Sequence, residues 1–139
     1  MISKPTQKSP YPRRLCFSSG SWGHERQLKF FQGSLYYGWF LDPLEQRVKF
    51  TPTAEQWIPF WDKIDVAGVW NWERYYENTE ILDGGQWSLI IARGSQMVFT
   101  EGSNAYPGVE GIEYSDSSSY GRFIQAIRQL TDDQKLFLA

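Results

Sequence analysis

The sequence predicts an α+β fold: a single antiparallel sheet built from hairpins, with two amphipathic helices packed on one face. Residue patterns typical of strands recur between residues 14 and 50 and again between residues 85 and 100. Each of these regions is followed by a segment with the apolar spacing of a helix. Because both helical segments are apolar on one side only, each is expected to bury that side against the sheet.

The N-terminal half is expected to supply the first strands. They are predicted over residues 14–19, 27–32, 35–41 and 46–50. A serine- and glycine-rich loop separates the first two strands, and the pair Asp42-Pro43 has the composition of a turn.

The first helix is predicted to begin after Thr53, because Thr53 and Gln56 have the spacing of a capping box. Pro59 lies beyond the first turn, where proline removes a hydrogen bond, so a kink or a later start is expected. The following segment, residues 66–78, could continue the helix after Gly68 or form a loop, and an extended segment entering the hairpin is favoured. One face of the helix carries Trp57, Phe60, Trp61 and Ile64.

The second helix is predicted to begin after Ser117 or Ser118, either of which can act as the N-cap. A second capping-box pattern at residues 131–134 predicts a short final helix through Leu138. The apolar stripe of the second helix consists of Tyr120, Phe123, Ile124, Ile127 and Leu130.

Residues 81–107 are predicted to form a hairpin whose two ends are polar and rich in glycine. A three-residue loop at 92–94 would place Gly94 where a left-handed conformation is wanted. That loop pairs Leu89 with Met97, and Trp87 with Phe99, and directs both pairs toward the helices.

Length and charge narrow the class of protein. The chain has 139 residues, a formal net charge of -2 and a pI of about 5.4, which argues against broad electrostatic attraction to nucleic acid or to an anionic membrane. Residues 1–12 are predicted to be a flexible lead interrupted by prolines, and residues 13–139 a single domain. Neither a signal peptide nor a membrane span is recognisable, so a cytoplasmic protein is expected.

Nucleophilic and metal-dependent catalysis have little support in the residue inventory. Cys16 and His24 are the only residues of their types, and neither has a companion at catalytic spacing. The usual nitrogen and sulfur ligands of a metal are too few. No catalytic residue, metal site or cofactor is therefore predicted, and the chain is expected not to be an enzyme. The carboxylates around the hairpin, from Glu73 to Glu101, leave general acid–base chemistry as a weaker alternative.

The strongest candidate surface precedes the hairpin, where aromatic residues flank an arginine. This composition is typical of a binding hot spot, and the rings are also suited to stacking on a sugar. An equal alternative is that Trp70 and Trp72 close one end of the core. The candidate binding residues here are Trp70, Trp72, Arg74, Tyr75 and Tyr76.

A second polar candidate is the turn at residues 102–107. The Asn104 amide and the Tyr106 hydroxyl offer groups that could hold a small ligand or a peptide backbone. The favoured alternative is structural, with Asn104 forming a turn and Tyr106-Pro107 covering the sheet edge.

The motifs WNW-x2-Y, DG-x2-W-S-L-I-I and G-S-N-A-Y-P, followed by an F-x3-I stripe, together resemble a class of small bacterial proteins. In that class a W-x3-Y segment leads to D-G-x-x-W-x-L-x-I, a G-x-N-x-Y-P turn and a final helix. The likeness covers residues 70–130, and the loop after Pro107 is longer here than the pattern implies. The class has no assigned activity, so the resemblance supports the fold more than a function.

The sequence thus favours a non-catalytic protein-binding domain, such as an immunity-type protein or a regulatory adaptor. A protein partner is expected, and nucleic acid and membrane partners are not. The alternative is a small-ligand or carbohydrate-binding module, and the third reading is a carboxylate-based enzyme.

Overall fold

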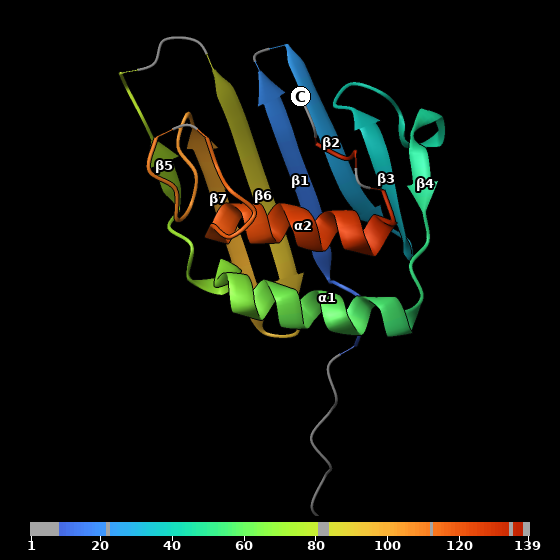
Figure 1. Ribbon diagram of the computed structural model, residues 1–139. Coiled ribbons are helices and arrows are strands. Elements are labelled where there is room, and N and C mark those ends of the chain that lie inside the picture. Colours follow the sequence, from blue (N-terminus) through green and yellow to red (C-terminus); the bar gives the residue numbers. More distant parts are fainter. Residues whose placement is uncertain (1–8, 22, 81–83, 112, 134, 138–139) are drawn as a thin grey trace, which may run out of the picture.

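The computed structural model describes residues 9–21, 23–80, 84–111, 113–133 and 135–137, and it confirms the α+β class. Within these residues, seven strands form one sheet in the order β4-β3-β2-β1-β6-β7-β5, and helices α1 and α2 cover one face (Figure 1). Neighbouring strands are antiparallel except β5 and β7, which run parallel. The sheet is therefore mixed, although it is built mostly from hairpins.

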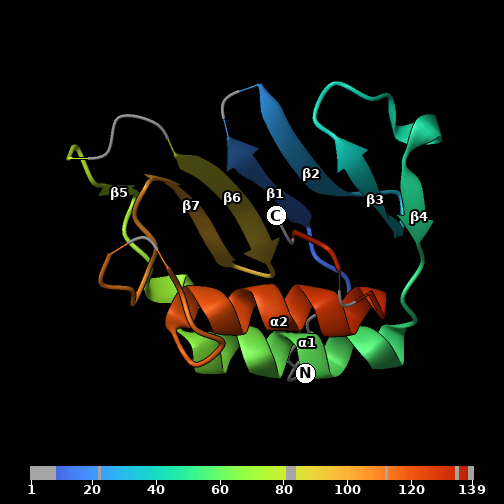
Figure 2. The ribbon, with the colours of Figure 1, turned by 45° about the horizontal axis from the view of Figure 1, so that its top comes forward.

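The elements have the following bounds. The strands are β1 (Arg14–Ser21), β2 (His24–Phe31), β3 (Ser34–Trp39), β4 (Val48–Phe50), β5 (Tyr75–Glu77), β6 (Gly85–Arg93) and β7 (Gln96–Ser103). The helices are α1 (Ala54–Ala67) and α2 (Ser119–Thr131), which lie side by side under the sheet (Figure 2). Short 3-10 turns occupy η1 (Leu44–Gln46) and η2 (Val69–Asn71).

Helix α1 begins at the predicted capping box. The Gln56 amide donates to the Thr53 hydroxyl at 3.2 Å, and the Thr53 amide donates to the Gln56 side chain at 2.8 Å. Its helical span includes Pro59, and its predicted apolar face is buried. Gly68 ends the helix in a left-handed conformation, with φ of 76°. Of residues 66–78, which were expected to be extended, 66–67 are helical, 69–71 form η2 and 75–77 form β5.

Helix α2 also confirms the sequence pattern, since Ser118 is its N-cap and all five predicted stripe residues are buried. The predicted final helix is wrong within the described residues, because Asp132 ends α2 in a left-handed conformation and 135–137 form a turn. Side chains hold that turn: Arg128 Nε donates to the Leu136 carbonyl at 2.8 Å, and the Phe137 amide donates to the Tyr37 hydroxyl at 3.1 Å.

The predicted register of the β6–β7 hairpin is also wrong. Arg93 pairs with Gln96, so the loop has two residues, and Leu89 pairs with Thr100 rather than with Met97. Trp87 likewise pairs with Gly102 rather than Phe99. Gly94 has a φ of 58°, which suits the first position of a tight two-residue turn whose twist matches the strands.

The end of the predicted N-terminal lead packs against the domain. Trp61 Nε1 donates to the Pro10 carbonyl at 2.7 Å, and Arg93 Nε donates to the Ser9 carbonyl at 3.2 Å. Residues 1–8 of the lead lie outside the described residues.

Candidate functional site

The sheet has a face covered by helices α1 and α2 and an opposite, open face (Figures 1 and 2). Strand β7 shows how exposure differs between the covered and the open face, because its side chains alternate between these two faces. Val98 and Thr100 are 8% and 0% exposed on the covered face, whereas Met97 and Phe99 are 57% and 38% exposed on the open face. A side chain's position in a strand therefore decides whether it packs in the core or meets solvent.

Trp72 and Tyr76, two of the predicted site residues, lie on the covered side. Trp72 Nε1 donates to the Ser119 hydroxyl at 2.7 Å, and its ring lies 5.7 Å from that of Trp87. The Tyr76 hydroxyl accepts from the Glu73 amide at 2.9 Å, and the Tyr76 ring also packs against Trp87. Both side chains are half-buried and help to close the core.

Trp70, Asn104 and Tyr106 also have structural partners. Trp70 stacks on Trp61 at 6.2 Å and donates its indole N–H to Asp65 at 2.7 Å. Asn104 is buried in a left-handed conformation, and its backbone N–H donates to the Gly85 carbonyl at 2.9 Å.

Tyr106 is half-buried, and its ring lies 4.7 Å from the ring of Tyr120. Burial raises the pKa of the Tyr106 hydroxyl. These contacts match the structural reading of the turn at residues 102–107.

Arg74 and Tyr75 lie instead beside two residues of β7 on the open face. The Arg74 guanidinium lies 3.9 Å from the centre of the Phe99 ring and 5.0 Å from that of Tyr75. It also forms an ion pair with Glu101 at 3.3 Å. A hydrogen bond from Tyr75 to the Glu101 carboxylate raises the pKa of Tyr75. These four residues, Arg74, Tyr75, Phe99 and Glu101, are called the Arg74 cluster below.

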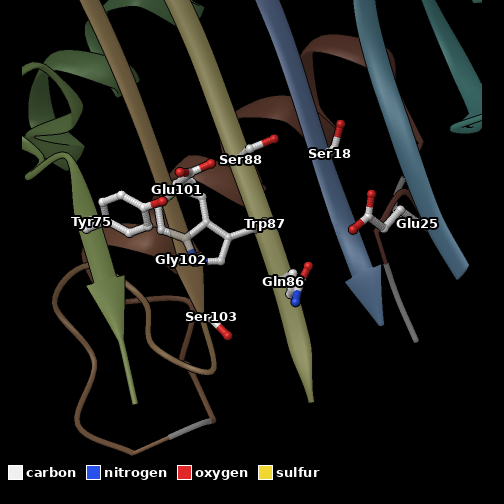
Figure 3. Close-up of a pocket in the computed structure, with 9 residues that line it drawn as sticks. All are labelled: Ser18, Glu25, Tyr75, Gln86, Trp87, Ser88, Glu101, Gly102 and Ser103. Carbon is white, nitrogen blue, oxygen red and sulfur yellow. The ribbon is translucent and has the colours of Figure 1, made fainter. Parts of the chain in front are cut away.

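A groove lies beside the Arg74 cluster on the open face and has a volume of about 310 Å³ (Figure 3). Strand pairing places Glu101 opposite Ser88, and Ser88 opposite Ser18, so small hydroxyl side chains line its centre. This polar groove is lined by Ser18, Glu25, Tyr75, Gln86, Trp87, Ser88, Glu101, Gly102 and Ser103.

The two carboxylates of the polar groove stand on opposite flanks (Figure 3). Glu25 is on β2 and Glu101 is on β7, with β1 and β6 between them. Three strand spacings, about 14 Å, separate their strands. Glu25 is also displaced by two residues, about 7 Å, along β2, because Gln27 rather than Glu25 lies in the row of Glu101, Ser88 and Ser18. Ser18, between them, is 7% exposed and accepts a hydrogen bond from Gln27 at 3.2 Å. The groove therefore presents two carboxylates, which only accept hydrogen bonds, around a centre of hydroxyl and amide groups that can both donate and accept.

Cys16 and His24 lie apart along neighbouring strands. Cys16 is paired with Lys29 and His24 with Ser21, so about five residues, or about 17 Å of strand, separate them. Burial raises the pKa of the Cys16 thiol, which disfavours the nucleophilic thiolate.

Sequence reasoning identified Arg74 and Tyr75 but missed Phe99 and the groove residues Ser18 and Ser88. Phe99 was assigned to the covered face by the wrong hairpin register. The sequence did hold a signal that Ser88 lies on the open face: in β6, Ser88 separates the two apolar residues Trp87 and Leu89. Only the pairing of β1 with β6 brings Ser18 next to Ser88.

A comparison of the chain with models of protein families finds no match, and a comparison with curated proteins finds no significantly similar one. No helix in the described part of the chain has both the length and the apolar character needed to cross a membrane.

Proposed function

We propose that this chain is a non-catalytic, cytoplasmic protein-binding domain whose partner docks on the open face of the sheet. The observation that carries the proposal is the Arg74 cluster, in which an arginine lies over exposed aromatic rings. Tyrosine, tryptophan and arginine are the residues that most often dominate the energy of protein interfaces. Tyr75 is 63% exposed, so much of its ring is available to a partner.

The cluster is also organised before any partner arrives. Arg74 is in contact with Phe99, Tyr75 and Glu101, which restrict a long side chain that otherwise has many rotamers. Restricting a side chain in advance lowers the entropy lost on binding. Met97, on the same face of β7, adds an exposed apolar side chain beside these residues. A few dominant contacts are therefore expected, with weakly contributing residues around them.

An immunity-type protein or a regulatory adaptor is the form of this function that the small size and acidic charge favour. The second candidate is a small-ligand or carbohydrate-binding module. The observation in its favour is the polar groove, which has a volume near the lower end for ligand pockets and is bordered by Tyr75.

The proposal is tested by photo-crosslinking in the source cell. A benzophenone amino acid replaces either Met97 on the open face or Val66 on α1, and both native side chains are exposed. A discrete protein adduct is expected from position 97 and not from position 66. Arg74→Ala and Tyr75→Ala should each reduce that adduct several-fold, consistent with hot-spot losses of about 1 kcal/mol or more.

The same experiment can contradict the proposal, most simply by giving no adduct from position 97, and also in two other ways. One is an adduct from position 66 with a yield equal to that from position 97. The other is an adduct at position 97 that is unchanged by Arg74→Ala and Tyr75→Ala. Circular dichroism of each purified variant establishes that a lost adduct is not caused by unfolding.

A further inference from the structure

We infer that the polar groove receives a basic side chain, lysine or arginine, of the protein that docks on the open face. This inference rests on the proposed function and names the chemistry of the partner at one position. The groove lies directly beside the Arg74 cluster and shares Tyr75 and Glu101 with it. A partner contacting the cluster would therefore present neighbouring side chains to the groove.

The charge of the groove favours a cation. Its lining includes the carboxylates of Glu25 and Glu101 and no lysine or arginine. Arg74 pairs with Glu101 from outside the lining, whereas Glu25 has no ion-pair partner in the part of the chain that the structure describes. Lowering the solvent exposure of Glu25 under a partner would be costly unless a positive charge accompanied it.

The hydrogen-bonding groups of the groove also suit a basic side chain. Ammonium and guanidinium groups only donate, with three and five N–H bonds respectively. The hydroxyls of Ser18, Ser88 and Ser103 and the amide oxygen of Gln86 can accept such bonds, as can the two carboxylates. An apolar side chain would leave these acceptors without partners, and an acidic one would be repelled.

The shape agrees with a single long side chain. The centre of the groove is formed by Ser18 and Ser88 on adjacent strands, with Gln86 farther along the same strand as Ser88. Glu25 lies on one flank, and Glu101 and Tyr75 lie on the other (Figure 3). A lysine or arginine side chain entering over Ser88 can lie along the part of this polar strip that leads to Glu25, with its charged end at the Glu25 carboxylate.

The test titrates the ¹⁵N-labelled chain with five blocked pentapeptides, Gly-Ser-X-Ser-Gly, where X is lysine, arginine, citrulline, norleucine or glutamate. The lysine or arginine peptide should give saturable amide shifts at Ser18, Gln86, Ser88 and Glu101. The neutral and acidic peptides should bind at least about tenfold more weakly, which corresponds to about 1.4 kcal/mol.

Matched variants then identify the groups responsible. Glu25→Gln should weaken binding of the basic peptide several-fold. The Glu25 carboxylate forms no ion pair within the described residues, so its charge is available to the peptide. Glu45→Gln removes an exposed carboxylate in η1, outside the groove, and should leave the affinity unchanged. Methyl glucoside serves as the probe for the carbohydrate alternative.

The peptide titrations would overturn the inference in three cases: equal binding of the citrulline and lysine peptides, absence of saturable shifts up to about 10 mM peptide, or saturable shifts at the groove amides with methyl glucoside. If the adduct from position 97 persists unchanged in Glu25→Gln, only the inference fails. If position 97 gives no adduct, the proposed function fails, whatever the peptides do.

Discussion

On the covered face of the sheet, aromatic rings pack against one another out of solvent, whereas on the open face they lie exposed beside charged groups. Trp87 is 3% exposed and is surrounded by the rings of Trp72, Tyr76 and Tyr120. Tyr75 is 63% exposed and contacts Arg74 and Glu101. The aromatic surplus of the sequence therefore divides into residues that stabilise the fold and residues available to a partner.

The division follows from the alternation of strands rather than from residue type. Tyr75 and Tyr76 are adjacent in β5, yet they point to opposite faces because successive side chains in a strand alternate. The covered ring contributes through burial and packing, and the open ring contributes little until a partner covers it. Substitutions on the two faces should consequently affect different properties, stability on one face and binding on the other.

The largest loss of stability is expected for Phe123→Ala on the covered face. Phe123 is fully buried, and its ring contacts those of Phe17 and Trp72. Truncation of a buried phenylalanine typically costs about 3–5 kcal/mol. Chemical denaturation should show this loss, whereas Gln129→Ala, on the exposed side of the same helix, should cost about 0.5 kcal/mol or less. Equal small losses would mean that the helix face is misassigned.

A smaller but substantial loss is expected for Gly102→Ala. A Cβ at this position would lie 2.1 Å from Trp87 Nε1 and 2.5 Å from the Ala105 carbonyl oxygen, which that indole N–H binds at 2.8 Å. The indole must shift to relieve the overlap, and overpacking of this kind costs about 1–3 kcal/mol. Urea denaturation measures the change. A variant as stable as the parent would contradict the tight contact.

The next effect is confined to alkaline pH. Burial, before all other causes, raises the pKa of Tyr120 well above that of an exposed tyrosine. The stabilisation from keeping this hydroxyl neutral is complete below the unfolded pKa, near 10, and is lost as pH rises through the folded pKa. Between these two pKa values, Tyr120 should lower the free energy of unfolding of the parent by about 1.4 kcal/mol for each pH unit. Tyr120→Phe should lack this decline. If the free energies of unfolding of parent and variant changed in parallel with pH, the raised pKa of Tyr120 would be contradicted.

The helices could be predicted from the sequence because their signals are local. The capping box at Thr53 and the stripe of α2 each depend on residues within a few turns, and both occur as expected. The hairpin register depends on which turn joins β6 to β7. The composition around Gly94 suits either a two- or a three-residue loop. The loop lies at residues 94–95 rather than 92–94, so the pairing is displaced by three residues. Because that number is odd, Met97 and Phe99 lie on the open face instead of the covered face.

The candidate site could be predicted only in part, because its assembly is not local. Composition pointed to Arg74 and Tyr75, but their partner Glu101 is identified by the parallel pairing of β5 with β7. Ser18 and Ser88 meet only because β1 lies beside β6 in the sheet. Neither serine belongs to a motif, so no sequence pattern marks them as groove residues.

The account is tested most directly by comparing Tyr75→Ala with Tyr76→Ala, in both unfolding free energy and photo-adduct yield from position 97. Tyr76→Ala should lower the unfolding free energy by about 2 kcal/mol or more, because it removes a ring packed on Trp87 and the acceptor of the Glu73 amide. Tyr75→Ala should change stability by less than about 1 kcal/mol, because the ring is largely exposed, and should reduce the adduct several-fold. Equal losses of stability in the two variants, or an undiminished adduct in Tyr75→Ala, would contradict the separation of a stabilising face from a binding face.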